Sequence, residues 1–178
     1  LLNSEYDLDR YLLKGDGMNY GVNLMIHKQS GSLTGWISCA VGRALRTFDD
    51  PDYPSVYPAS HERIYELNAL CSYEYEKWQF SGTFVCAGGT PFTAPESFYL
   101  SAGNLITKYG EYNSSRLRPY IRLDLSVNFS FRKDGRQENG LNISGYNVLA
   151  RKNEFVWRLN IDDGTFSYRP MAFFMRMM

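Results

Sequence analysis

The feature of this sequence that most restricts the fold is a strict alternation of apolar and polar side chains between Tyr120 and Arg132. Every second residue is a large apolar one, in the order Ile121, Leu123, Leu125, Val127, Phe129 and Phe131. The residues between them are polar or charged: Arg122, Asp124, Ser126, Asn128 and Ser130. Successive side chains of a β-strand point to opposite faces, whereas an amphipathic helix repeats about every 3.6 residues. We therefore expect a strand with one apolar face and one polar face.

The same two-residue period recurs along most of the chain. We expect seven strands, at residues 19–27, 33–46, 63–75, 78–87, 120–132, 141–160 and 166–178, and a weaker eighth candidate at 6–13. The connections at 29–32, 76–77 and 133–138 are short. Those at 47–60 and 88–117 are long, and a shorter one at 162–165 lies on the same side as these two.

Short turns at one end and long loops at the other, joining amphipathic strands of about ten residues, are typical of outer-membrane β-barrels. The predicted fold class is therefore all-β, an antiparallel meander of about seven strands forming part of a transmembrane outer-membrane β-barrel. The strands of a soluble sandwich or lipocalin-like barrel also alternate apolar and polar residues. The regular meander without Greek-key connections favours a closed wall.

Composition excludes several other classes. The 178 residues carry 19 Lys+Arg and 19 Asp+Glu, so the formal net charge is zero and nothing favours a nucleic-acid partner. Aromatic residues make up 16% of the chain, yet the mean hydropathy is -0.38, which suits strands with one apolar face. No run approaches the about 20 apolar residues of a transmembrane helix. The chain lacks an initial Met and a basic, apolar leader, so we expect a piece of a longer or processed protein.

The three cysteines, Cys39, Cys71 and Cys86, have neither the spacing of a disulfide framework nor that of a zinc site. All three fall on apolar positions of the alternation, where a thiol acts as a small hydrophobic group. We expect them to face lipid.

Metal binding and catalysis find little support. The carboxylates of the 47–60 loop are irregularly spaced and have one His nearby, which is a weak ligand set: Asp49, Asp50, Asp52 and His61. Ser60, His61 and Glu62 contain hydrolase-type residues, but neighbours in an extended chain point to opposite sides. We expect no metal, no other cofactor and no enzymatic activity.

Two segments resemble a known family. Residues 35–38 (Gly-Trp-Ile-Ser), followed by Arg43, resemble a strand found late in the barrels of TonB-dependent outer-membrane receptors. Residues 118–126 (Arg-Pro-Tyr-Ile-Arg-Leu-Asp-Leu-Ser) resemble that family's Pro-Pro-Tyr-x-Arg-Leu-Asp-Leu-Ser strand. Shorter matches occur at 62–68, 78–82, 88–91 and 142–147. The sequence departs from the family at Cys39, Ala40, Gly42 and Tyr65, where Tyr, Thr, Ser and His are usual.

The resemblance implies that residues 1–178 are the C-terminal segment of a receptor β-barrel, with no plug domain and no terminal aromatic residue. Such a receptor is an active transporter in the cell outer membrane of a Gram-negative bacterium. It binds and imports a ligand such as an iron-siderophore, a cobalamin or an oligosaccharide. Its implied partners are the TonB complex, reached through the plug domain missing here, and membrane lipid and lipopolysaccharide.

Tyrosines with an Arg are suitable recognition groups for sugars or chelates, since they offer large contact area with few rotatable bonds. The ligand-binding residues expected in the two long loops are Tyr53, Tyr57, Tyr99, Tyr109, Tyr112 and Arg116. An aromatic girdle at the membrane interface requires the same residue types and is an equal alternative for the tyrosines of the second loop. For Tyr120, Trp78 and Trp157 we prefer the girdle.

The strand pattern also predicts which side chains face which way. Trp36, Ser38, Asn68, Arg122 and Asp124 should face the lumen, and Leu123, Leu125, Val127 and Phe129 should face lipid. The inward polar row Arg122, Asp124, Asn128 and Arg132 is expected to hydrogen-bond a plug or neighbouring strands. Two alternatives remain open: a complete eight-stranded barrel that uses 6–13 and has a structural or adhesion role, and a soluble β-rich binding module.

Overall fold

The computed structural model describes residues 14–48, 50, 53–134, 137–162 and 165–173, and every regular element in these ranges is a strand. The strands are β1 (Gly15–Lys28), β2 (Leu33–Phe48), β3 (Tyr57–Pro58), β4 (Tyr65–Tyr75), β5 (Trp78–Ala87), β6 (Pro91–Phe92), β7 (Pro95–Ser101), β8 (Asn104–Tyr109), β9 (Ser115–Arg116), β10 (Tyr120–Asp134), β11 (Gln137–Gly145), β12 (Asn153–Asp162) and β13 (Thr165–Phe173). Within the same ranges, no helix has the length and apolar content needed to span a membrane. The all-β prediction is confirmed for the described residues.

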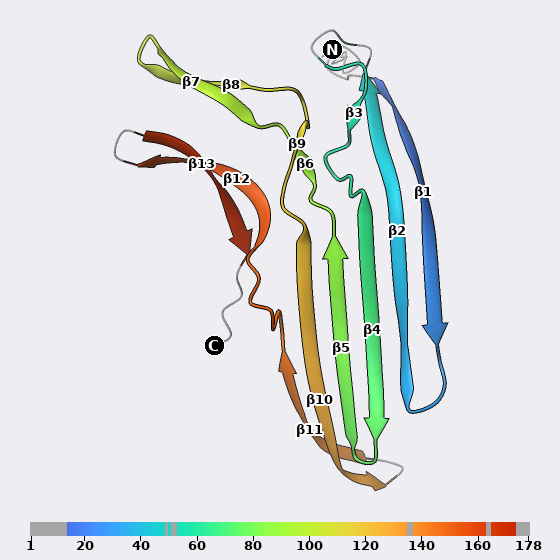
Figure 1. Cartoon of the computed structure of the whole chain (residues 1–178). Coiled ribbons are helices and arrows are strands. Elements are labelled where there is room, and N and C mark those ends of the chain that lie inside the picture. Colours follow the sequence, from blue (N-terminus) through green and yellow to red (C-terminus); the bar gives the residue numbers. More distant parts are fainter. Residues whose placement is uncertain (1–13, 49, 51–52, 135–136, 163–164, 174–178) are drawn as a thin grey trace, which may run out of the picture. The chain divides into compact units, whose positions relative to one another are not determined.

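Seven strands form one sheet in the order β1-β2-β4-β5-β10-β11, with β3 paired to β2 (Figure 1). The pairs with a resolved register are antiparallel. Strands β1, β4 and β10 end at the same end of the sheet, at the bottom of Figure 1. The expected antiparallel meander is therefore confirmed for this sheet, whereas β13, expected as the last strand of the meander, pairs with β12 in a separate two-stranded sheet. The candidate strand at 6–13 lies outside the described residues.

Two stretches differ from the sequence-based expectation. The 88–117 segment, expected to be irregular, contains the β7–β8 hairpin, because Ala102 and Gly103 both have positive φ (50° and 82°) and close a two-residue turn. The segment at 141–160, expected to be one strand, is interrupted between β11 and β12. There Asn147 and Ala150 have positive φ, and the Ala150 amide donates to the Asn147 carbonyl at 2.8 Å.

The chain divides into two compact units, which we treat separately. Unit 1 contains residues 1–20, 43–62 and 90–116, and unit 2 contains residues 21–42, 63–89 and 117–178. Unit 1 holds the long connections, and unit 2 holds most of the sheet.

Register assigns the side chains of unit 2 to two chemically different faces. Paired residues of an antiparallel sheet share a face, so one row runs Ile37, Ala69, Phe84 and Leu123, and the next runs Ser38, Asn68, Val85 and Arg122. The first row belongs to an apolar face that also carries Leu125, Val127 and Phe129, and all three cysteines. The second belongs to a polar face that also carries Trp36 and Asp124. The predicted grouping of side chains on two faces is confirmed.

The polar face is tied together by side-chain hydrogen bonds that cross four strands. Asn142 of β11 donates to Asn128 of β10, Asn128 donates to Gln79 of β5 at 3.1 Å, and Gln79 donates to Ser72 of β4 at 3.2 Å. The amide and hydroxyl groups of this face therefore satisfy one another across the strands.

The side chains of the apolar face are not covered by other described residues. Ile37 and Phe80 are each 44% exposed and Leu125 is 47% exposed. Among the described residues the buried apolar side chains are few: Tyr57, Ala59, Ala87, Pro91 and Leu117. A water-soluble sheet protein normally buries its apolar face against a second layer, and the described part of this chain does not bury it.

Candidate functional site

Three of the tyrosines expected to bind ligand meet in unit 1. Tyr53, Tyr57 and Tyr112 gather with Phe48 in what we name the aromatic cluster. The ring centroids of Tyr57 and Tyr112 are 4.7 Å apart in an edge-on contact, and those of Tyr53 and Tyr112 are 5.6 Å apart. Phe48 lies 5.2 Å from Tyr53. The cluster joins the end of β2, the short β3 and the segment that follows β8.

The members of the aromatic cluster differ in exposure. Tyr57 is buried, with 6% of its surface exposed, whereas Tyr112 is 40% exposed. Burial raises the pKa of the Tyr57 hydroxyl, and Tyr112 and Tyr53 raise it further. Tyr57 thus anchors the cluster in its neutral form, and Tyr112 is the most exposed ring of the cluster.

A buried carboxylate lies on the same segments. Glu62 is 1% exposed and accepts hydrogen bonds from Arg43 Nε at 2.8 Å, from the Ala44 amide at 3.0 Å and from Arg116 Nη2. We name Glu62, Arg43 and Arg116 the ion cluster. Burial alone would raise the pKa of the Glu62 carboxyl, but hydrogen bonds from the two arginines and from Ala44 outweigh it and hold that pKa below its ordinary value. Glu62 is therefore ionised at neutral pH, and the ion cluster carries a net charge of about +1.

Asn113, next to Tyr112 in the sequence, bonds its segment to two other parts of unit 1. It is buried, has a φ of +53°, and donates from its side-chain amide to the Pro58 carbonyl at 2.8 Å. Its backbone amide donates to the Thr93 hydroxyl at 3.0 Å. These bonds hold the segment that carries Tyr112 against β3.

The other expected ligand-binding residues separate into two groups. Arg116 is half-buried in the ion cluster through its bond to Glu62. Tyr99 and Tyr109 lie on the β7–β8 hairpin, where both are exposed. Tyr99 is paired with Ile106, three residues before Tyr109, so the two tyrosines point to opposite sides of the hairpin. The structure thus brings together Tyr53, Tyr57 and Tyr112, with Arg116 nearby in sequence.

Sequence reasoning missed Phe48, Arg43 and Glu62 as parts of this site. Arg43 entered only through the family resemblance, and Glu62 only as a neighbour of His61. No local pattern distinguishes a buried carboxylate from a solvated one, because its partners come from residues 19 and 54 positions away. The bonds of Glu62 to two guanidinium groups leave it unsuited to act with His61, whose side chain is exposed.

Polar side chains also meet on the polar face of unit 2. Arg122 forms an ion pair with Asp124 at 3.0 Å and donates to the Tyr146 hydroxyl at 2.8 Å and the Tyr120 hydroxyl at 3.1 Å. Its guanidinium carbon lies 4.7 Å from the centre of the Tyr146 ring. Tyr120 therefore belongs to the polar face, and its interpretation as a girdle residue is wrong because its hydroxyl serves Arg122.

Trp78 fits the girdle interpretation better. Its ring centroid lies 4.5 Å from that of Phe129 and 6.2 Å from that of Phe80, all on the apolar face near the short turns. The Trp157 and Arg132 side chains lie outside the described part of the structure, as do Asp49 and Asp52.

The described residues contain no group of three or more His, Cys, Asp or Glu side chains that could hold a metal ion. The chemical resources of unit 1 are aromatic faces, phenolic hydroxyls and partly exposed guanidinium edges. Such groups stack on and hydrogen-bond to a ligand without reacting with it.

Comparison with protein-family models, curated proteins and solved structures returned no match for this chain.

Proposed function

We propose that this chain is part of the β-barrel of a TonB-dependent outer-membrane receptor, an active transporter that imports a ligand such as an iron-siderophore, a cobalamin or an oligosaccharide. The family rests on the sequence resemblance of residues 35–38 and 118–126 described above. The membrane environment rests on the two faces of the sheet.

The observation that carries the proposal is the uncovered apolar face of unit 2. It extends over β2, β4, β5, β10 and β11, and several of its large side chains, among them Ile37, Phe80 and Leu125, are 44–47% exposed. Exposed apolar patches of this kind mark contact with protein or membrane. The opposite face carries hydrogen-bonded Asn, Gln and Ser side chains, which suits the polar interior of a barrel.

Strand length is consistent with membrane crossing. The apolar row of β10 from Ile121 to Phe129 spans eight residue steps, about 26 Å along the strand at about 3.3 Å per residue. At a tilt of about 40° this row would cover about 20 Å of membrane thickness, against an apolar band of about 25 Å in outer-membrane barrels. Trp78, Phe80 and Phe129 would then form an aromatic girdle at the short-turn end.

The proposal gives unit 1 the role of ligand contact. In outer-membrane barrels the short turns are periplasmic and the long connections extracellular. The aromatic cluster and the ion cluster lie on the long connections, where Tyr112 and the exposed edges of Arg43 and Arg116 would meet an incoming ligand. Energy for import would come from the TonB complex acting through a plug domain outside this chain.

Fractionation of the source cells tests the proposal. An antibody raised against the β7–β8 hairpin should detect, in the outer-membrane fraction, a protein several times larger than 20.5 kDa. Its gel mobility should change on boiling, since a folded barrel resists denaturation by detergent. Deleting the gene should abolish growth on one iron chelate, cobalamin or oligosaccharide, and so should deleting tonB.

Other outcomes would favour the alternatives. A heat-modifiable membrane band near 20.5 kDa would indicate a small complete barrel, and a band in the soluble fraction would indicate a soluble binding module. Either result would refute the receptor assignment.

A further inference from the structure

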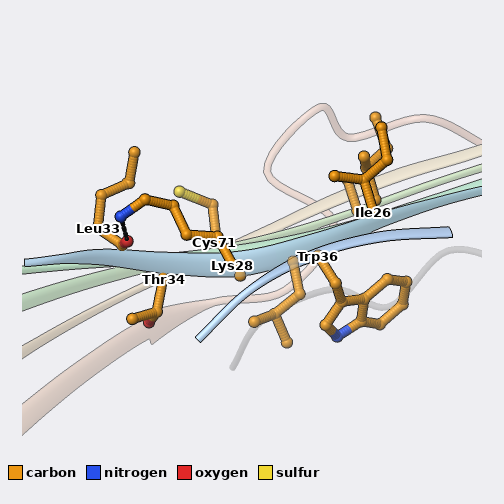
Figure 2. A pocket seen from close by; sticks show the side chains of 10 residues that line it. Ile26, Lys28, Leu33, Thr34, Trp36 and Cys71 are labelled. Carbon is orange, nitrogen blue, oxygen red and sulfur yellow. Dashed lines mark hydrogen bonds between the residues drawn. The ribbon is translucent and has the colours of Figure 1, made fainter. Parts of the chain in front are cut away.

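The apolar face of unit 2 contains a hollow of about 280 Å³ that is lined by residues of the neighbouring strands β1, β2 and β4. Its lining is almost entirely apolar and includes Ile26, Leu33 and Cys71, with Gly35 between them. Figure 2 shows Ile26, Leu33, Cys71 and Lys28 on one side of the ribbon, and Thr34 and Trp36 on the other.

The hollow exists because one row of the sheet carries only small residues in β2, β4 and β5, before it reaches Leu125 of β10. Gly35 of β2 is paired with Cys71 of β4, and Cys71 is paired with Gly82 of β5. The neighbouring rows carry larger groups, Leu33 and Tyr73 on one side and Ile37 on the other. A side chain cannot be added at Gly35, since its Cβ would lie 2.1 Å from the Leu70 carbonyl oxygen. The close approach of β2 and β4 therefore maintains a depression in the apolar face.

A cation lies at the rim of this depression. Lys28 is the last residue of β1, and its ammonium donates to the Leu33 carbonyl at 2.8 Å (Figure 2). It also donates to the Ser30 carbonyl at 2.8 Å. An ammonium has three N–H groups, so one remains for an outside acceptor. The charge is held at the short-turn end, next to the apolar lining, by bonds that also fix its direction.

An apolar hollow with a fixed cation at one end matches the chemistry of a phospholipid, in which an anionic phosphate adjoins an acyl chain. We propose that the hollow over Gly35 binds one phospholipid of the inner leaflet, with the phosphate on Lys28 and an acyl chain between Ile26, Leu33 and Cys71. This inference rests on the proposed function, because it requires the apolar face to lie in a bilayer. The inner leaflet follows from the position of Lys28, since short turns of outer-membrane barrels are periplasmic.

Two pairs of variants test the site in the full-length protein. Cys71→Phe fills the hollow from an exposed wall position, and Cys39→Phe is its matched control, exposed on the same face but outside the lining. Lys28→Gln removes the charge, and Lys77→Gln removes a charge from another short turn of the same end. Each protein is extracted in mild detergent, delipidated and mixed with palmitoyl-oleoyl phosphatidylethanolamine. Native mass spectrometry then measures the fraction that retains one lipid.

We expect wild type and both controls to retain one lipid alike. Cys71→Phe and Lys28→Gln should each reduce the retained fraction by about tenfold, which corresponds to about 1.4 kcal/mol. Equal retention in all five proteins would overturn the inference while leaving the proposed function intact. Stronger retention of lipid A with the same dependence on Cys71 and Lys28 would refute the assignment to an inner-leaflet phospholipid. If the protein does not insert into membranes at all, the proposed function fails, and this inference fails with it.

Discussion

Replacing Leu125 with arginine should destabilise the membrane-inserted protein by about 3 kcal/mol, whereas arginine at Ser126 should cost less than about 1 kcal/mol. The two residues are adjacent in β10 but point to different faces. Leu125 is paired with Gly82 and Gly145 on the apolar face, where nearly half of its surface is exposed. Ser126 belongs to the polar face.

The magnitude follows from the position of Leu125 along the strand. It lies four positions after Ile121 and four positions before Phe129, at the middle of the apolar row. Arginine on the lipid face costs about 2–4 kcal/mol at the bilayer midplane and about 0–1 kcal/mol near the interfaces. A cost of about 3 kcal/mol lowers the folding equilibrium constant by about 150-fold. On a sheet exposed to water, the same substitution would change stability by about 0.5 kcal/mol or less.

The assay is a urea titration of the full-length protein refolding into lipid vesicles, followed by tryptophan fluorescence and by the heat-dependent gel shift. Leu125→Arg should move the midpoint far more than Ser126→Arg, with the same slope. Equal and large losses would refute the assignment of the two faces. Equal and small losses would show that the apolar face does not lie in lipid, and would remove the main support for the membrane proposal.

Three further substitutions test contacts within the two units. Glu62→Gln should speed hydrogen exchange of the Ala44 amide by about tenfold or more at neutral pH, because it removes the charged acceptor of that amide. Burial would raise the pKa of Glu62, but its hydrogen bonds outweigh burial and lower that pKa from 4.5. In the wild type, the protection of the Ala44 amide from exchange should therefore be complete above about pH 4.5 and decline as pH falls through the folded-state pKa of Glu62. An exchange profile that does not depend on pH, after correction for intrinsic rates, would contradict this prediction. Gly89→Ala should lower the free energy of unfolding by about 3 kcal/mol or prevent folding, since the added Cβ would lie 1.7 Å from the Leu117 carbonyl oxygen. A thermal unfolding midpoint equal to that of the wild type would disprove this contact. Asn153→Ala should lower the free energy of unfolding by about 1–3 kcal/mol in the same measurement, because the Asn153 side chain accepts from the Ile121 backbone N–H and donates to the Ile121 carbonyl. Asn153→Asp keeps only the acceptor and should not restore stability.

Much of the sheet could be predicted because strand periodicity is a local property. The strand expected at 120–132 appears as β10, and the two-residue turn at 76–77 joins β4 to β5 as expected. The β7–β8 hairpin was missed because its only local signal is the Ala-Gly pair at 102–103 among Ser and Asn residues. The break between β11 and β12 was missed for a different reason. It accompanies Asn153 bonding to the Ile121 backbone, a contact between residues 32 positions apart.

The order of side chains by itself determined which residues share a face. Alternate residues of an extended chain must point the same way, so Leu123 and Leu125 were separated from Arg122 and Asp124 before any contact was known. Only the tertiary structure decided which groups meet. Register placed Gly35 beside Cys71 and so created the hollow, and chain folding brought Arg43 and Arg116 to Glu62. The physical reason is that the ionisation and burial of a carboxylate depend on donors from distant segments, and no local pattern encodes their positions.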